Sequence, residues 1–335
     1  MTTQAPLLSW VEQFREKVGF GIEVFAHASD PRPSEAVIAA GQLVDRLGID
    51  AYLIGDHPGY ATEAWLHLAA VAMTTSRVRL GSVVNCASHR HPAMLARLAA
   101  DLDNISGGRL LLGLGIGWNA HEFGQLGLPF RSVRERQEAL AETVEIIRGL
   151  WGPEPFTFSG RYYSTTEGHV APPPIQQPAP PLIIAGAGEQ TTFRLVAKYA
   201  DACNFGPGRN VGVVRSGDEI QRKLDVLHQR CDEIGRPFDQ ILKSHFTSWL
   251  ILGDTDEEAQ EKLTGYYPDG LTDDQRLTRI AGSPARVIPY FQSLVDAGMQ
   301  YFVVQILDAR DTQTMELLAT EVAPQVRSLA QRAND

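Results

Sequence analysis

Short apolar runs typical of β-strands alternate with helical segments along most of this chain. Eight such runs occur, at residues 20–26, 51–54, 78–84, 109–114, 182–185, 202–205, 241–252 and 301–305. Each is followed by a segment that reads as a helix, in most cases from apolar residues at helical spacing. Repeated strand–helix units make parallel strands, and eight of them close into a barrel. We therefore predict an α/β fold of the (β/α)8 TIM-barrel class with insertions; an open, doubly wound sheet is the alternative.

The length of the chain suits one barrel and leaves room for an insertion. A TIM barrel takes roughly 250 residues, and this sequence has 335, with no shift in composition that would divide it. The alternation is interrupted at about 155–181 by a polar segment in which six of the last ten residues, 172–181, are prolines. Such a stretch favours an extended path. We expect a single domain over 1–335, with a hairpin and an extended excursion inserted at about 155–181.

Charge and cysteine content narrow the class of protein. The net charge is −10 at pH 7, which argues against a broad nucleic-acid or membrane surface, because such surfaces need clustered Lys and Arg. The three cysteines, Cys86, Cys203 and Cys231, form no CxxC pair, as is usual in reduced cytosolic enzymes. The first twenty residues lack the pattern of a signal peptide, and no run reaches 18 apolar residues. We predict a cytoplasmic protein with a small-molecule substrate and no nucleic-acid or membrane partner.

Three glycines stand at alternate positions behind a run of leucines in LLLGLGIGWN, residues 110–119. A dinucleotide-binding loop needs GxGxxG opening directly into a helix, whereas here Trp118 and a segment that reads as a loop, 119–130, follow. Gly113, Gly115 and Gly117 instead remove side chains from one face of a strand end, where a flat ring could lie. Tight packing of the strand against a helix is the alternative.

Polar residues that could transfer a proton follow two of the predicted strands. Asp56 and His57 come directly after the second strand, at the end of a barrel where catalytic residues gather, and a histidine can act as acid or base near neutral pH. A simple turn is the alternative. His27 follows the first strand, and Glu23 within that strand could be interior. For both, a solvated or hydrogen-bonded residue is the simpler interpretation.

The segment IIAGAGEQTT, residues 183–192, is the best candidate for binding a phosphate group. A strand ends there and a helix is expected from Glu189 to about Ala200. Free N–H groups at a helix start, next to glycines, attract anions; a short connecting loop is the alternative. No metal site is predicted: His89 and His91 lack a third ligand at suitable spacing.

Several long segments taken together resemble one family. They are LGSVVNCASHRHPAMLARLAADLDNISGGRLLLGLGIGWNAHEFGQLGLPF, PFTFSGRYY, PPPIQQPAPPLIIAGAGEQTTFRLVAKYADACNFG and AGSPARVIPYFQSLVDAGMQYFVV. The combination resembles the bacterial-luciferase-like flavin and deazaflavin superfamily, and within it most the coenzyme F420-dependent oxidoreductase branch. The resemblance implies a TIM barrel with a deazaflavin ring across its mouth.

The resemblance also implies positions for the cofactor. The ring would rest against a bulge at the end of the third strand, matched here by Val83, Val84 and Asn85, often with a non-prolyl cis peptide. The polar residue after the second strand is matched by Asp56. The residues that match the phosphate-binding loop are Gly186, Ala187, Gly188 and Glu189.

The function implied is transfer of a hydride between coenzyme F420 and a small organic substrate such as an alcohol, an enone or an imine. A reduced-FMN-dependent monooxygenase of the same fold is the alternative, and a non-catalytic flavin-binding protein is the second alternative. Some F420-dependent sugar dehydrogenases carry a glutamate acid where this chain has Trp118, so a sugar phosphate is disfavoured. His57 is the first candidate for the proton-transfer group and His27 the second. The family further suggests a homodimer, and a separate reductase would recycle the cofactor.

Overall fold

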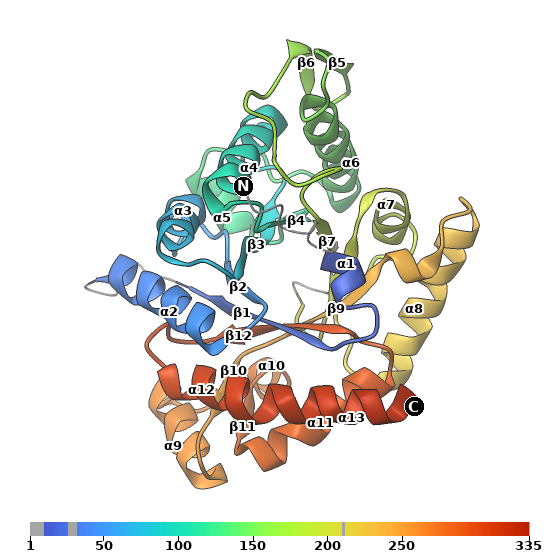
Figure 1. Ribbon diagram of the computed structural model, residues 1–335. Helices are drawn as coiled ribbons and strands as arrows, with labels where there is room; N and C mark the ends of the chain where they lie inside the picture. Colours follow the sequence, from blue (N-terminus) through green and yellow to red (C-terminus); the bar gives the residue numbers. More distant parts are fainter. Residues whose placement is uncertain (1–9, 26–31, 210–211, 335) are drawn as a thin grey trace, which may run out of the picture.

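Eight parallel strands close into a barrel in the computed structural model, which describes residues 10–25, 32–209 and 212–334 (Figure 1). Around the barrel the strands follow the order β1-β12-β9-β8-β7-β4-β3-β2, so that β1 pairs with both β12 and β2. The barrel strands are β1 Gly19–Val24, β2 Ala51–Ile54, β3 Arg79–Cys86, β4 Leu110–Gly115, β7 Leu182–Ala185, β8 Ala202–Phe205, β9 Leu242–Thr247 and β12 Tyr301–Ile306. The predicted (β/α)8 barrel is thereby confirmed.

Helices between the strands form the outer layer (Figure 1). Their boundaries follow local signals: Gly107 ends α4 in the left-handed conformation, and Ser132 and Glu135 form a capping box at the start of α6. The main helices are α2 Pro33–Leu47, α3 Ala64–Thr74, α4 Pro92–Ser106, α6 Val133–Leu150, α7 Thr192–Tyr199, α8 Gly217–Asp232, α9 Asp256–Tyr266, α11 Pro284–Asp296, α12 Thr312–Leu317 and α13 Ala323–Asn334. Among the described residues, none of the helices combines the length and apolar character needed to span a bilayer.

The amino-terminal end of the barrel is filled with aromatic side chains. The short helix α1, Trp10–Gln13, lies against this end (Figure 1). The rings of Trp10 and Phe14 pack edge-on against Tyr301 of β12, with centroids 5.0 and 5.1 Å away. They continue an apolar cluster inside the barrel that includes Leu111 and Val303. A ligand therefore has to approach from the opposite end, where the strands finish.

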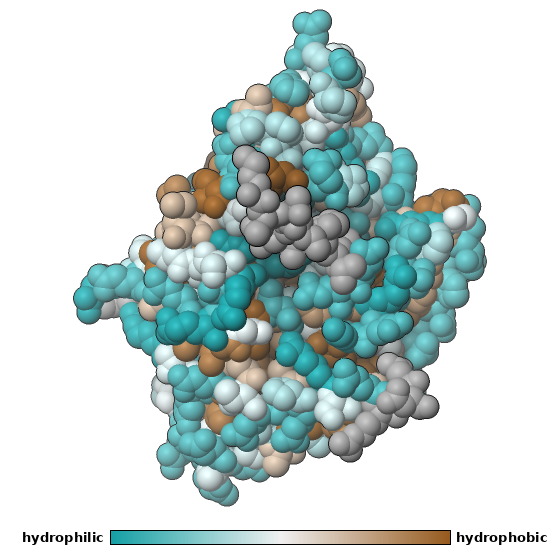
Figure 2. Space-filling model, in the orientation of Figure 1, coloured by the Kyte–Doolittle hydropathy of each residue, from teal (hydrophilic) through white to brown (hydrophobic). Residues whose placement is uncertain are grey.

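A hairpin lies between α6 and β7. Its antiparallel strands are β5 Phe156–Ser159 and β6 Ser164–Gly168. The hairpin projects from the barrel, and its tip is covered by hydrophilic residues (Figures 1 and 2). Glu142 of α6 holds its turn by accepting hydrogen bonds from the backbone N–H groups of Arg161, Tyr162 and Tyr163, at 2.7, 3.0 and 3.0 Å.

Three predicted boundaries are wrong. The run 241–252 is not one strand: β9 ends at Thr247, and β10, Leu250–Leu252, leaves the barrel to pair with β11, Ile280–Gly282. Both pieces are fully buried, so their apolar pattern continues across the break.

The other two concern helices. The segment 119–130 is not all loop, because Ala120–Gln125 forms α5, capped by the Asn119 side chain. Helix α7 begins at Thr192 rather than at Glu189.

Candidate functional site

The carboxyl ends of the barrel strands surround a cavity of about 370 Å³. Its wall combines side chains of β1, β3, β8, β9 and β12 with the segments that follow β2, β4 and β7 and the start of α6. Active sites of TIM barrels lie at this end, and small-molecule pockets typically measure roughly 300–1,000 Å³. The cavity is therefore the candidate active site.

A buried carboxyl group, Glu23 of β1, faces the cavity from inside the barrel. Gln305, its register partner on β12, donates a hydrogen bond from Nε2 to Glu23 Oε2 at 2.8 Å. Burial raises the pKa of Glu23 to about 8, and the hydrogen bond from Gln305 offsets this only in part. At neutral pH Glu23 is therefore mostly protonated and able to donate its proton.

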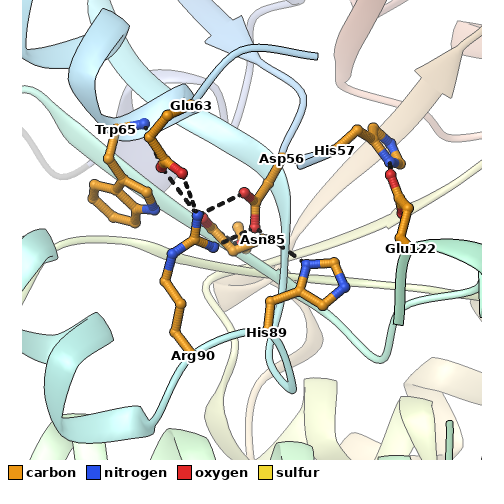
Figure 3. A network of polar contacts seen from close by, with 9 residues as sticks. Asp56, His57, Glu63, Trp65, Asn85, His89, Arg90 and Glu122 are labelled. Carbon is orange, nitrogen blue, oxygen red and sulfur yellow. Dashed lines mark hydrogen bonds and ion pairs between the residues drawn. The ribbon is translucent and has the colours of Figure 1, made fainter. Parts of the chain in front are cut away.

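The imidazole of His57 is held by groups from several segments. Its Nδ1 lies 3.0 Å from Glu122 Oε1 and 3.3 Å from Oε2 (Figure 3). The ring of Tyr60 stacks on it with a centroid distance of 4.8 Å, and the rings of Phe25 and Trp118 approach to 5.5 and 6.0 Å. The first predicted proton-transfer residue therefore lines the cavity, with a carboxylate partner that no sequence pattern indicated.

Asp56 also lines the cavity, but both of its carboxylate oxygens are bound by Arg90. The distances are 2.7 Å from Nη1 to Oδ2 and 3.0 Å from Nη2 to Oδ1 (Figure 3). Arg90 also reaches Glu63 at 3.0 and 3.1 Å, and His89 Nδ1 lies 4.0 Å from Asp56. This network joins the loops after β2 and β3. The second predicted proton-transfer residue, His27, lies outside the described residues.

The end of β3 has the bulge and the non-prolyl cis peptide that the family resemblance implies. The cis bond joins Val83 and Val84, and the register of β3 against β4 shifts between Ser82 and Asn85. Val83 and Val84 line the cavity. Asn85 is buried and donates from Nδ2 to the carbonyl oxygen of Gly113 at 3.0 Å, while its Oδ1 has no hydrogen-bond partner among the described residues.

The three glycines of β4 and its end make room for protein atoms. A Cβ on Gly113 would collide with the carbonyl oxygen of Ser82, and one on Gly115 would lie 2.6 Å from a methyl group of the bulge. One on Gly117 would lie 2.5 Å from Cys86 Sγ. Gly115 and Gly117 line the cavity, and Gly113 packs behind it. Close packing thus explains Gly113, although its partner is a strand and not a helix.

The loop after β7 has the predicted glycines but a later helix start. Residues 186–188 line the cavity, with Gly186 at a φ of 119°. The carboxylate of Glu189 is bound by Lys223 and Arg222 of α8, at 2.6 and 2.7 Å. Hydrogen bonds from Lys223 and then Arg222 lower the pKa of Glu189. Since α7 begins at Thr192, the loop 189–191 separates the glycines from the helix.

Arg136 is a residue of the cavity that no sequence pattern singled out. It lies in the first turns of α6 and is 5% exposed, and its buried Nε and Nη1 have no hydrogen-bond partner in the part of the chain that the structure describes. Its guanidinium lies 4.0 Å from the centroid of the Phe130 ring. The next residue, Gln137, donates to Thr192 Oγ1 at 3.3 Å, which places this turn beside the loop 186–188. A guanidinium cannot lose its proton, and buried donors without acceptors are costly, so an anionic group on a ligand would satisfy these nitrogens.

His91, one of the histidines that follow β3, lies at the start of α4. The His91 side chain caps α4 by accepting a hydrogen bond from the Ala93 N–H at 3.2 Å. Within the described parts of the chain, no three His, Cys, Asp or Glu side chains gather in a way that could hold a metal ion.

Comparisons with known proteins place the chain in a family. Residues 19–322 match the family model described as luciferase-like monooxygenase. An F420-dependent glucose-6-phosphate dehydrogenase of Kineococcus radiotolerans is 28% identical over 325 residues, which cover 88% of this chain and 96% of the relative. The monooxygenase RslO1 from Streptomyces bottropensis has a similar structure, with a TM-score of 0.77 and 24% identity over 92% of this chain and 99% of its own. So does the coenzyme F420-dependent tetrahydromethanopterin reductase from Methanopyrus kandleri, with a TM-score of 0.76, 21% identity and the same coverage. These two structures share the fold. Because the family model spans most of the sequence, this chain belongs to the luciferase-like monooxygenase family.

Proposed function

We propose that this protein is an F420-dependent oxidoreductase that transfers a hydride between the deazaflavin and a small organic substrate such as an alcohol, an enone or an imine. Relatives that align over most of the chain are named for F420-dependent dehydrogenation. Their identity of 28% supports the cofactor and the reaction class. The family resemblance disfavours glucose 6-phosphate as the substrate, because Trp118 stands where some F420-dependent sugar dehydrogenases carry a glutamate acid.

The observation that carries the proposal is Arg136 on the cavity wall, whose Nε and Nη1 are buried and have no hydrogen-bond partner among the described residues. A phosphorylated ring cofactor fits this wall. Its phosphate would lie between Arg136 and the loop 186–188, where Gly186 and Gly188 leave the backbone accessible. Its ring would lie beside the bulge of Val83 and Val84.

Other side chains of the cavity can transfer protons. When bound, the deazaflavin supplies the carbon that accepts or donates the hydride. The chain itself has to supply or remove one proton at the substrate heteroatom or carbon. His57 is suited to accept the proton of an alcohol, and the neutral carboxyl group of Glu23 is suited to protonate an imine or enone. Trp118, which is 52% exposed and lines the cavity, would form part of the substrate wall.

The acidic tail of F420 favours cations at the rim of the cavity. Arg209 lines the cavity and pairs with Asp274 at 3.2 Å. Arg194 is exposed on α7, and Arg161 pairs with Glu138 near the hairpin. Of these three residues, Arg209 is therefore the one placed to meet a tail that leaves the cavity.

Titration of the protein with F420 and with FMN, followed by absorbance difference spectra, tests the proposal. We expect saturable binding of F420 and much weaker binding of FMN. Arg136→Gln should weaken binding of phosphorylated cofactor by about 10–100-fold, because a hydrogen bond to a charged group contributes roughly 1.5–3 kcal/mol. Binding of the same deazaflavin without its phosphate should change little. Tight binding of FMN without binding of F420 would instead support the oxygen-using alternative, and no binding of either would overturn both.

We further propose that the chain is cytoplasmic, as its cysteine content suggests, that it dimerises with a second copy, as the family resemblance suggests, and that a separate enzyme recycles the cofactor. Recycling follows from the redox balance, since each turnover changes the cofactor by one hydride. Light scattering on the purified protein would test the dimer.

A further inference from the structure

We propose that Glu122 sets the tautomer of His57, so that the proton stays on Nδ1 and Nε2 is left to exchange a proton with the substrate. The inference rests on the proposed function and adds a positioning residue to it. Glu122 lines the cavity beside His57, and its proposed action is through His57.

The contact between the two residues joins distant parts of the chain inside the protein. Glu122 lies in α5, 65 residues after His57, and its side chain is 3% exposed while that of His57 is 18% exposed. Both carboxylate oxygens lie within hydrogen-bond reach of Nδ1, at 3.0 and 3.3 Å (Figure 3). Among the described residues, the side chain of Glu122 has no other hydrogen bond or ion pair, and Nε2 of His57 has no partner. The carboxylate is therefore dedicated to one ring nitrogen.

Packing restricts the movement of the His57 ring. The Tyr60 ring stacks almost parallel to the imidazole, at an interplanar angle of 19°. A Cβ on Gly59 would lie 2.8 Å from Glu122 Cγ, so the loop that carries His57 is pressed closely against α5. A ring held in this way keeps the same nitrogen facing each neighbour.

The tautomer of His57 follows from which of the two partners has a hydrogen to donate. An ionised carboxylate has no hydrogen to donate, so Nδ1 must carry one, and in the neutral imidazole Nε2 then has the free lone pair. When an alcohol is oxidised, Nε2 would take the hydroxyl proton as the carbonyl bond forms, and the bound cofactor would supply the acceptor for the hydride of the adjacent carbon. Glu122 stabilises the imidazolium that results. In the reverse direction the imidazolium returns that proton to the oxygen.

Nitrogen-15 NMR of the full-length protein, labelled in its histidines, tests the tautomer without cofactor or substrate. His57→Ala identifies the relevant signals. We expect His57 to carry its hydrogen on Nδ1 in the wild type. In Glu122→Gln the amide can donate to Nδ1, and we expect the hydrogen to move to Nε2. A hydrogen on Nε2 in the wild type overturns the inference.

Kinetics separate a positioning role from a structural one. With F420 and an alcohol that the wild type oxidises, Glu122→Gln should lower kcat on the order of 10²–10⁴-fold. KM and the Kd of F420 should change by less than about threefold, and Glu122→Asp should recover part of kcat. The double variant with His57→Ala should be no slower than His57→Ala alone, since both changes remove one function.

The matched control is His121→Gln, a change to the exposed neighbour on the same short helix, which should leave kcat unchanged. Additive losses in the double variant, or a Glu122→Gln protein with nearly full kcat, would overturn the role of Glu122 and leave the proposed function intact. Failure of the wild type to bind F420 would contradict the proposed function itself, while the NMR result would still report on the tautomer.

Discussion

At the scale of single residues, the chemistry of the site depends on side chains held in unusual surroundings. Glu23 is nearly inaccessible to water, so its charged form is disfavoured and its proton is retained at neutral pH. Arg136 is buried without acceptors for two of its nitrogens, which suits it to an anion that arrives with the ligand. Neither property can be read from the residue type alone, because glutamate is usually ionised and arginine usually solvated at a protein surface.

Glu23→Gln should change how stability depends on pH. The folded pKa of about 8 lies above the ordinary value of 4.5, so the folded state holds a proton that the unfolded chain releases between these values. The wild type therefore loses stability as pH rises through this window, by a few kcal/mol in total, because a pKa difference of one corresponds to about 1.4 kcal/mol. Glutamine does not titrate, so the stability of the variant relative to the wild type should increase from pH 5 to 8.

Urea unfolding of both proteins across that pH range measures the difference. Glu261→Gln, at an exposed position on α9, is the control and should show no such trend. A constant difference between Glu23→Gln and the wild type would mean that Glu23 is not a buried neutral acid.

At the scale of elements, the site depends on how β3 and β4 fit together. The bulge of β3 brings Val84 into the cavity, and it can do so because β4 has glycines opposite. The pattern of alternate glycines was visible in the sequence, but its purpose was not. An alternate-glycine strand end can serve a ligand or a neighbouring backbone, and the choice depends on a strand about 30 residues away in the chain.

Gly113→Ala should therefore destabilise the fold. The added Cβ meets a backbone carbonyl oxygen of β3, which cannot move aside as a flexible side chain would. Overpacking of this kind typically costs about 1–3 kcal/mol, and the free energy of unfolding in urea should fall by that amount.

Gly124→Ala in α5 is the matched control, since a Cβ there meets no atom within 4 Å. Alanine favours a helix over glycine by about 1 kcal/mol, so this variant should be as stable as the wild type or more so. Equal stability of both variants would show that β3 shifts to accommodate the Cβ added at position 113.

At the scale of the whole molecule, the barrel is closed by contacts between the two ends of the chain. β1 pairs with β12, and Arg327 of α13 binds Asp50 at the start of β2 at 2.6 Å. The same arginine donates to the carbonyl oxygen of Val18, and Asp50 accepts from the Phe20 N–H at 2.7 Å. These bonds tie the last helix to the first strand.

Arg327→Leu should lower the free energy of unfolding by about 1–3 kcal/mol, because it leaves the mostly buried carboxylate of Asp50 without its cation. Arg134→Leu is the comparison. Arg134 pairs with Glu138 at 2.9 Å on the surface of α6, with 87% of its side chain exposed, and its loss should change stability little. Similar effects of the two changes in urea unfolding would show that closure does not depend on Asp50.

The sequence by itself determined the architecture and the outline of the site. Strand-like and helical patterns alternate along the chain, and each depends only on residues close in sequence. The eight units, the hairpin insertion and the polar residues after the strands could therefore be predicted from local sequence. His57, the bulge and the loop 186–188 do line the cavity, as their positions at strand ends implied. The break between β9 and β10 escaped prediction, because both pieces are buried and neither glycine nor proline marks where the chain leaves the barrel.

Only the tertiary structure decided which side chains meet. The partners His57 and Glu122 are 65 residues apart, and Arg136 enters the cavity from a helix outside the barrel. Glu23 holds its proton because of a burial that no local pattern records. Charge state and hydrogen-bond partnership depend on distance and solvent access in three dimensions, and these are settled only when the barrel closes.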